Sequence, residues 1–118
     1  TGVSNVQVAY NLRDIDASGD DADQRVALQY RVGTSGNFIN VPAGYVADAS
    51  TGPNFATLVT PVSVTLPAAV DNQAQVQVRI ITTNAGGNDE WIGIDDINIS
   101  GTTTNSAPVL DLNGEVSG

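Results

Sequence analysis

The sequence predicts an all-β domain, an antiparallel β-sandwich with a jelly-roll-like arrangement. Two observations favour this fold. First, Val, Ile and Thr together supply 34 of the 118 residues, whereas Leu occurs six times and Lys and Met are absent. Branched side chains suit a pleated sheet and crowd a helix. Second, apolar and polar residues alternate over much of the chain, which is typical of antiparallel strands with one face on a core and one in water.

Four stretches carry this alternation clearly, and turn residues separate them. The residues 34–37 lie after the second stretch and predict a hairpin that leads into a short strand at 38–41. Pro42 and Gly44 are expected to end that short strand. Residues 47–60 are irregular, and we expect them to cross from one sheet to the other. The four stretches are 6–13, 26–32, 62–66 and 75–80. Pro61 and Pro67 flank the third of them.

The last clear strand, 91–100, contains an irregularity. Ile92 and Ile94 stand at even-numbered positions, whereas Ile97 and Ile99 stand at odd-numbered ones, so the alternation changes its parity at Asp95-Asp96. A β-bulge there would add one residue and return the apolar side chains to one face. The alternative is a strand buried on both faces, with the two acids at its solvated end.

The composition changes after Ser100. Residues 101–106 are rich in Thr, Asn and Ser, which indicates a linker. Residues 107–114 then look like the opening strand of something else. We therefore place a sandwich domain at 1–100, followed by a linker and the start of another strand or domain at 101–118.

Composition excludes several kinds of chemistry. The chain has no Cys and no His, which removes disulfides, thiolate nucleophiles, zinc ribbons and the Ser-His-Asp triad. A formal charge of −9 would repel a phosphate backbone or an anionic membrane, and no apolar run approaches the roughly 20 residues of a membrane span. A carboxylate pair for glycoside hydrolysis is conceivable, but it needs a substrate cleft that a small sandwich rarely supplies. We therefore expect no enzyme, and, since no signal peptide opens the chain, a mature fragment.

The acidic segment 14–23 contains a spacing suited to a hard cation. Asp14, Asp16, Ser18 and Asp20 stand at alternate positions, and oxygen ligands in that spacing favour Ca²⁺. Arg25 stands where an EF-hand needs a Glu, and the flanks are predicted strands, so the segment is not an EF-hand. The alternative is a solvated acidic hairpin turn.

Two further carboxylates, Asp95 and Asp96, are adjacent in the last strand and repel each other unless a cation or an Arg relieves them. Asp14 and Asp16, at the end of their strand, could meet Asp95 or Asp96 around one ion. The predicted metal ligands are therefore Asp14, Asp16, Asp20, Asp95 and Asp96.

Two aromatic residues are candidates for ligand binding. Trp91, the single Trp, begins the last strand beside an acidic loop, where an exposed indole could stack on a sugar ring. The alternative that we favour is a Trp that closes the end of the core. Tyr45, in the long irregular part of the chain, carries the same ambiguity.

Several of these runs resemble a known kind of module. They are YNLRDID at 10–16, VALQYRVG at 26–33, VQVR at 76–79 and WIGIDDI at 91–97. The chain looks like the jelly-roll accessory module of large secreted or surface bacterial proteins, including extracellular nucleases and RTX-like calcium-dependent proteins, and is distantly similar to MAM-type domains. The resemblance implies a secreted or cell-surface location and a non-catalytic role, often with Ca²⁺.

Three functional hypotheses follow. The first is a calcium-stabilised module with a structural or adhesive role, whose partners are neighbouring domains or subunits of a surface assembly. The second is a carbohydrate-binding module with a glycan ligand. The third is a subunit of an extracellular filament, in which Val109, Leu110 and Leu112 fill an incomplete sheet of a neighbouring copy by strand donation. The same tail could instead complete the sheet of its own domain, and the alternative that we favour is a disordered stub of the next domain.

Overall fold

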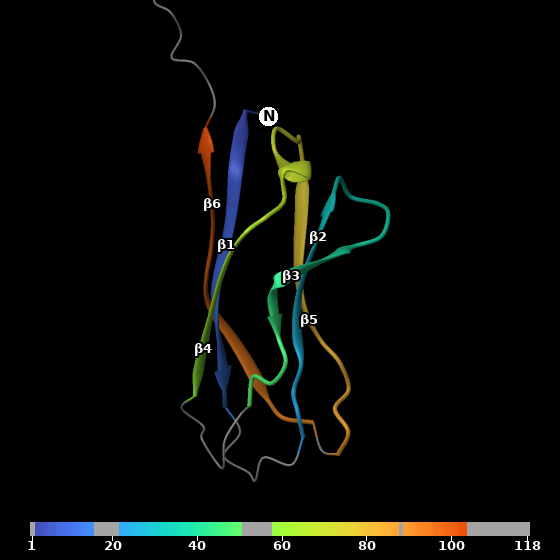
Figure 1. Ribbon diagram of the computed structural model, residues 1–118, viewed down its shortest axis with the longest axis vertical. Coiled ribbons are helices and arrows are strands. Elements are labelled where there is room, and N and C mark those ends of the chain that lie inside the picture. The colour runs from blue at the N-terminus through green and yellow to red at the C-terminus, as the bar shows by residue number, and fades with distance from the viewer. Residues whose placement is uncertain (1, 16–21, 51–57, 88, 104–118) are drawn as a thin grey trace, which may run out of the picture.

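The computed structural model describes residues 2–15, 22–50, 58–87 and 89–103 (Figure 1). Strands dominate these residues, and none of the described helices is long and apolar enough to cross a membrane. The elements in chain order are β1 (Val3–Asp14), β2 (Val26–Val32), β3 (Ile39–Val46), β4 (Val59–Thr65), the short 3₁₀ helix η1 (Ala68–Val70), β5 (Val76–Thr82) and β6 (Ile92–Thr103).

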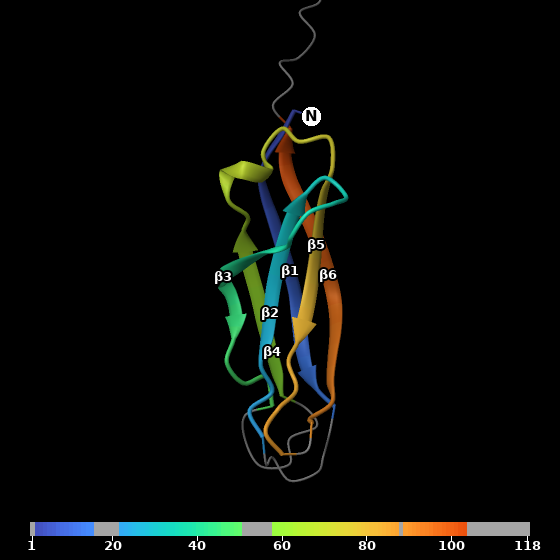
Figure 2. The same cartoon turned by 90° about the vertical axis from the view of Figure 1, so that its right-hand side faces the viewer.

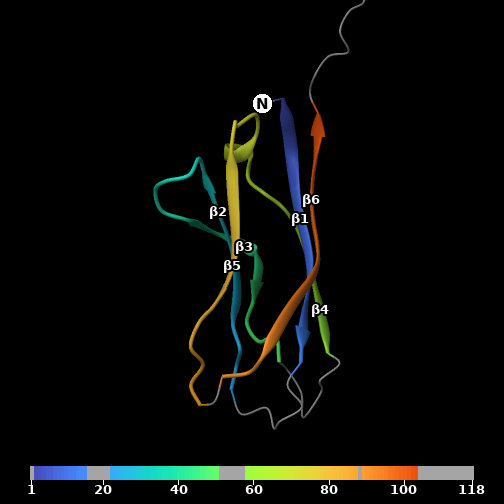
Figure 3. The same cartoon turned by 180° about the vertical axis from the view of Figure 1, so that it is seen from behind.

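The six strands form two three-stranded sheets, in the orders β4-β1-β6 and β3-β2-β5, and every strand pair is antiparallel. The sheets pack face to face, as the views from the front and from behind show (Figures 1 and 3). The predicted all-β antiparallel sandwich is confirmed. The expected crossing after β3 is also confirmed, since β3 and β4 belong to different sheets.

The core lies between the central strands β1 and β2. Their alternating apolar side chains point at each other, as the period of two predicts, and the outer strands and η1 contribute the remainder. Leu12, Val26 and Leu28 are completely buried. The buried cluster consists of Val8, Tyr10, Leu12, Val26, Leu28, Tyr30, Val41, Ala49, Val62, Val64, Leu66 and Val70.

The predicted bulge in the last strand is confirmed. Between the pairs Ala9–Asn98 and Asn11–Asp95, β1 advances by two residues and β6 by three. Asp96 absorbs the extra residue with a φ of 53°. As a result the isoleucines on both sides of the bulge face the core side of the sheet. The strand also continues past the expected end at Ser100, through Gly101 to Thr103.

Strand β3 differs from its expected form, because it does not end at Pro42. Between the pairs Leu28–Val41 and Val26–Val46, β2 advances by two residues and β3 by five, so β3 contains a bulge of three extra residues. An edge strand tolerates Pro in such a bulge because its backbone nitrogen owes no ladder hydrogen bond. Gly44 then packs on Leu28, where a Cβ would lie 2.9 Å from Leu28 Cβ.

Candidate functional site

One end of the sandwich gathers most of the buried polar side chains. We call it the Gln24 end, after its central residue; β1, β3 and β5 finish there, and β2, β4 and β6 begin there (Figure 1). The buried polar residues are Asp14, Gln24, Ser50 and Glu90. All four lie in or next to the segments that join the two sheets at this end.

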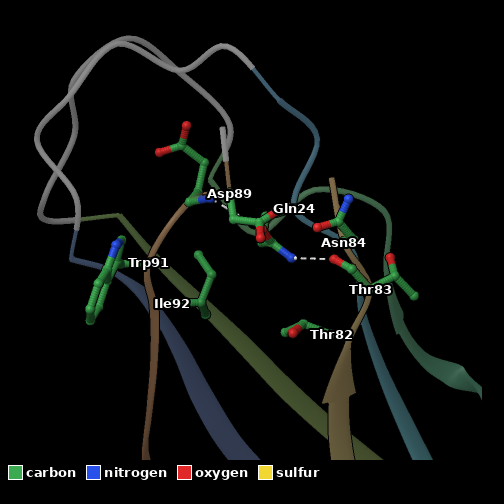
Figure 4. A pocket seen from close by; sticks show the side chains of 8 residues that line it. Gln24, Thr82, Thr83, Asn84, Asp89, Trp91 and Ile92 are labelled. Atoms are coloured by element: carbon green, nitrogen blue, oxygen red, sulfur yellow. Dashed lines mark hydrogen bonds between the residues drawn. The ribbon is translucent and has the colours of Figure 1, made fainter. Parts of the chain in front are cut away.

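Gln24 connects four segments of the chain. Its Nε2 donates to the Thr83 carbonyl at 3.0 Å, and its Oε1 accepts from the Glu90 backbone N–H at 3.2 Å (Figure 4). Its backbone N–H donates to Asp48 Oδ1 at 3.1 Å, and its carbonyl accepts from the Ala49 N–H at 2.9 Å. A buried amide with these partners fixes the relative positions of the loops.

The sequence reasoning did not single out Gln24. A signal for it exists, because Gln24 shares the parity of Val26 and Leu28 and therefore precedes them on the core-facing side. A polar residue in that phase must find hydrogen-bond partners inside the protein.

Two acids at this end are used to shape loops. Asp48 Oδ1 accepts from the backbone N–H of Ser50 at 3.0 Å and from its Oγ at 2.8 Å, while Ser50 itself is completely buried. Asp89 Oδ1 accepts from the backbone N–H of Ala85 at 2.8 Å. The two bonds from backbone N–H groups are local side-chain-to-backbone bonds of the kind that hold a turn.

Asp14 and Glu90 are the buried acids among the described residues. The backbone N–H of Ile15 donates to the Trp91 carbonyl at 3.1 Å, so the β1–β6 ladder reaches the residue next to Glu90. The other predicted ligands in this segment, Asp16 and Asp20, lie outside the described residues. Within the ranges that the structure describes, no three acidic side chains gather closely enough to hold a metal ion.

Asp95 and Asp96 lie elsewhere, on the outer face of the sheet. Asp95 opposes Asn11 and pairs with the Arg13 guanidinium, and Asp96 Oδ2 accepts from Asn11 Nδ2 at 3.0 Å. The mutual repulsion of these two carboxylates is thus relieved by an Arg. Asp14 opposes Ile92 on the core side, so the structure does not bring Asp14 together with Asp95 and Asp96 around one ion.

Trp91 does not close the core, and that expectation was wrong. Its side chain is 71% exposed, because the period of two that points Ile92 inward points Trp91 outward (Figure 4). Trp91 stands at the rim of a cavity of about 560 Å³. The cavity is lined by Gln24, Thr82, Thr83, Asn84, Asp89, Glu90, Trp91 and Ile92.

Tyr45 lies at a different cavity, of about 450 Å³, over the sheet β3-β2-β5. Tyr45 is half-exposed there, beside two amides joined by a bond of 2.6 Å from Gln29 Nε2 to Asn40 Oδ1. Arg79 Nε donates to Gln29 Oε1 at 2.7 Å. The two predicted ligand-binding aromatics therefore belong to separate cavities.

A cation–π cluster continues along the same side of this sheet. The guanidinium carbons of Arg31 and Arg79 lie 4.5 Å and 4.1 Å from the centre of the Phe38 ring. Two of the four arginines of the chain are thus held against one aromatic side chain, which keeps their charge away from the Gln24 end.

No family model, no curated protein and no solved structure matches this chain. The residues predicted for strand donation, Val109, Leu110 and Leu112, lie outside the described residues.

Proposed function

We propose that this chain is a non-catalytic, calcium-stabilised β-sandwich module of a secreted or cell-surface protein, with a structural or adhesive role in a larger assembly. The observation that carries the proposal is the burial of two carboxylate-bearing side chains, Asp14 and Glu90, at the Gln24 end. The acidic segment 14–23 leaves β1 at this same end.

Charge supports a cation at this end. Carboxylate oxygens are the ligands that Ca²⁺ prefers, and Asp14 and Glu90 supply such oxygens from buried side chains. Three of the four arginines have other partners: Arg13 is paired with Asp95 on the outer face of the sheet, and Arg31 and Arg79 lie against Phe38. A divalent ion bound by Asp14, Glu90 and the acids of the adjoining segment would reduce a formal charge of −9.

The uses of the other acids support a structural role. Asp48 and Asp89 hold loops through backbone hydrogen bonds, and Asp95 is paired with Arg13. Hydrolysis by two carboxylates needs one acid and one base that flank a substrate. At the Gln24 end Asp48 and Asp89 instead support the connections between strands.

Thermal unfolding in Ca²⁺ and in EDTA tests the proposal. A free ligand concentration 100 times its dissociation constant should stabilise the fold by about 2.7 kcal/mol. Asp14→Asn should abolish that gain. Asp71→Asn is the matched control, because Asp71 accepts from the Asn5 backbone N–H at 3.1 Å near the opposite end of β1 and should leave the gain intact.

A spectroscopic arm covers the case in which Asp14→Asn fails to fold. Tb³⁺ bound near Glu90 should show emission sensitised by Trp91, and Ca²⁺ should displace it. Identical melting curves in Ca²⁺ and EDTA, together with no sensitised Tb³⁺ emission, would refute the calcium site.

A second candidate function is glycan binding at the Tyr45 cavity. The observation that favours it is a half-exposed aromatic ring beside the amides of Gln29 and Asn40 on a concave surface. Ligand sites typically combine aromatic side chains with a few polar groups that fix orientation. A tyrosine ring can stack on a pyranose while the amides meet its hydroxyls.

A glycan array on the full chain tests this candidate, with two single variants. If the Tyr45 cavity binds sugar, Tyr45→Ala should lose binding and Trp91→Ala should retain it. The opposite pattern would move the site to the cavity at the Gln24 end, and an array with no binder would remove the candidate.

A further inference from the structure

Positive charge is concentrated on the outer face of the sheet β3-β2-β5, which is turned toward the viewer in Figure 2. The three strands of this sheet contain two arginines, Arg31 and Arg79, and neither Asp nor Glu, so their formal charge is +2. The whole chain, in contrast, has four Arg and 13 acids and a formal charge of −9. A surface whose charge is opposite to that of the rest of the molecule favours an anionic ligand.

The register shows that both arginines point away from the core. Tyr30 of β2 is buried, so its chain neighbours Gln29 and Arg31 point to the outer face of the sheet. Arg79 of β5 opposes Gln29 in the ladder, and opposed residues point to the same side of a sheet. The two guanidinium groups therefore share one face.

Neighbouring side chains hold these two guanidinium groups in place. Both guanidinium carbons lie within 4.5 Å of the centre of the Phe38 ring. Arg31 Nε donates to Gln77 Oε1 at 2.7 Å, and Arg79 Nε donates to Gln29 Oε1 at 2.7 Å. Groups that are fixed before a ligand arrives lose less conformational freedom when it binds.

Arg79 keeps most of its hydrogen-bond donors available. A guanidinium has five N–H donors. In the ranges that the structure describes, Arg79 uses one of them, in its bond to Gln29, and it pairs with no acid. The residue is exposed, so its two terminal nitrogens can donate parallel hydrogen bonds to one carboxylate or sulfate group.

The Tyr45 cavity adjoins this arginine. Gln29, which accepts the bond from Arg79, lines the cavity together with Asn40 and Tyr45. A ligand that occupies the cavity and contacts Gln29 is therefore next to a side chain that the guanidinium already touches.

We propose that this face binds an acidic glycan, a sugar chain that carries carboxylate or sulfate groups. Arg79 pairs with an acid group of the ligand, and Tyr45 stacks on a sugar ring. Arg31, held on the same Phe38 ring as Arg79, adds a second positive charge for the ligand. The inference rests on the glycan candidate described under the proposed function, and it specifies the class of sugar.

The negative charge of the whole chain does not prevent this binding. Asp95 and Asp96 lie on the outer face of the other sheet, where Asp95 is paired with Arg13. Packed sheets are about 10 Å apart, which exceeds the Debye length of about 8 Å at physiological ionic strength. Salt therefore screens these two carboxylates from a ligand on the sheet β3-β2-β5.

Titration calorimetry on the full chain tests the inference with two matched pairs of probes. Hexagalacturonate should bind at least tenfold more tightly than its methyl ester, or sulfated maltohexaose at least tenfold more tightly than maltohexaose, and the pair that responds distinguishes a carboxylate from a sulfate ligand. EDTA is present throughout, so that binding does not depend on Ca²⁺. High salt should weaken the binding of the acidic probe.

Three variants assign the contacts. Arg79→Gln and Tyr45→Ala should each weaken binding of the acidic probe at least tenfold. The matched control, Arg13→Gln, removes the same charge from the outer face of the other sheet and should leave binding within twofold. Circular dichroism verifies that each variant is folded.

The outcomes separate this inference from the glycan candidate. Equal affinity for the acidic and the neutral probes, lost only in Tyr45→Ala, would overturn the acidic ligand and leave the glycan candidate intact. Binding of the acidic probe that survives Arg79→Gln or Tyr45→Ala would place the ligand elsewhere and overturn the inference. No binding of any of the four probes would also overturn it, whereas the glycan array decides the glycan candidate independently.

Discussion

Replacing Tyr10 with Phe should stabilise the protein, and the gain should grow in alkaline solution. Tyr10 is 2% exposed, and its Oη has no hydrogen-bond partner among the described residues. A buried hydroxyl without a partner costs about 1–3 kcal/mol of lost hydration. Phe keeps the ring in the core and removes that cost, so Tyr10→Phe should raise the free energy of unfolding by about 1 kcal/mol at pH 7.

The pH dependence follows from the same burial. Burial raises the pKa of the Tyr10 phenol above its ordinary value of 10.0. The unfolded chain therefore releases this proton at a lower pH than the folded protein does. Below pH 10 the ionisation of Tyr10 does not change the free energy of unfolding. As the pH rises from 10 through the folded-state pKa, that free energy falls, by at most about 1.4 kcal/mol for each pH unit.

Urea denaturation followed by circular dichroism measures both effects. The difference in unfolding free energy between Tyr10→Phe and the parent isolates Tyr10 from every other titrating group. It should be constant from pH 7 to about 9.5 and should widen above pH 10. A variant less stable than the parent at pH 7 would mean that the hydroxyl has a partner, and a difference that does not change above pH 10 would refute the raised pKa.

Two further substitutions test packing and surface charge. Gly44→Ala should lower the free energy of unfolding by about 1–3 kcal/mol, because the new Cβ meets Leu28 at 2.9 Å, whereas Gly86→Ala, with open space around it, should change it by less than about 0.5 kcal/mol. Equal effects in urea denaturation would contradict the packing of β3 on β2. Arg13→Gln should lower the free energy of unfolding by less than about 1 kcal/mol, because the side chains of Arg13 and Asp95 are 41% and 44% exposed. High salt should reduce this loss, since it screens the ion pair. A larger loss that salt leaves unchanged would contradict the surface pairing.

The period of two explains why much of the fold could be predicted. In β2 the alternation runs unbroken from Val26 to Val32, and the strand has those bounds. The change of parity at Asp95-Asp96 marks the bulge because one extra residue is the simplest way to keep isoleucines on one face. The same alternation does not show how far a strand is covered, so the exposure of Ile97 depends on its place at a sheet edge.

Other features depend on contacts between distant segments. β3 passes Pro42 because its bulge packs Gly44 on Leu28, a contact that local turn preferences do not reveal. The partner of Asp95 is Arg13, 82 residues earlier, and only the β1–β6 register determines that choice. In the candidate site the composition of the sequence indicates the acidic segment, whereas Gln24 is significant because it bonds to three other parts of the chain, at residues 48–49, 83 and 90.

The pairing of β1 with β6 determines how the sandwich responds to tension. Val3 opposes Thr103 at one end of an antiparallel ladder, and the ladder extends from this pair to the Gln24 end, where β1 finishes and β6 begins (Figure 1). A force that draws these two residues apart acts across the strands and loads one pair of hydrogen bonds at a time. The ladder would open like a zipper from Val3 and Thr103 downward, at lower force than a sheet pulled along its strands. A module loaded in this way would lengthen at low force and limit the load that reaches whatever is attached to it.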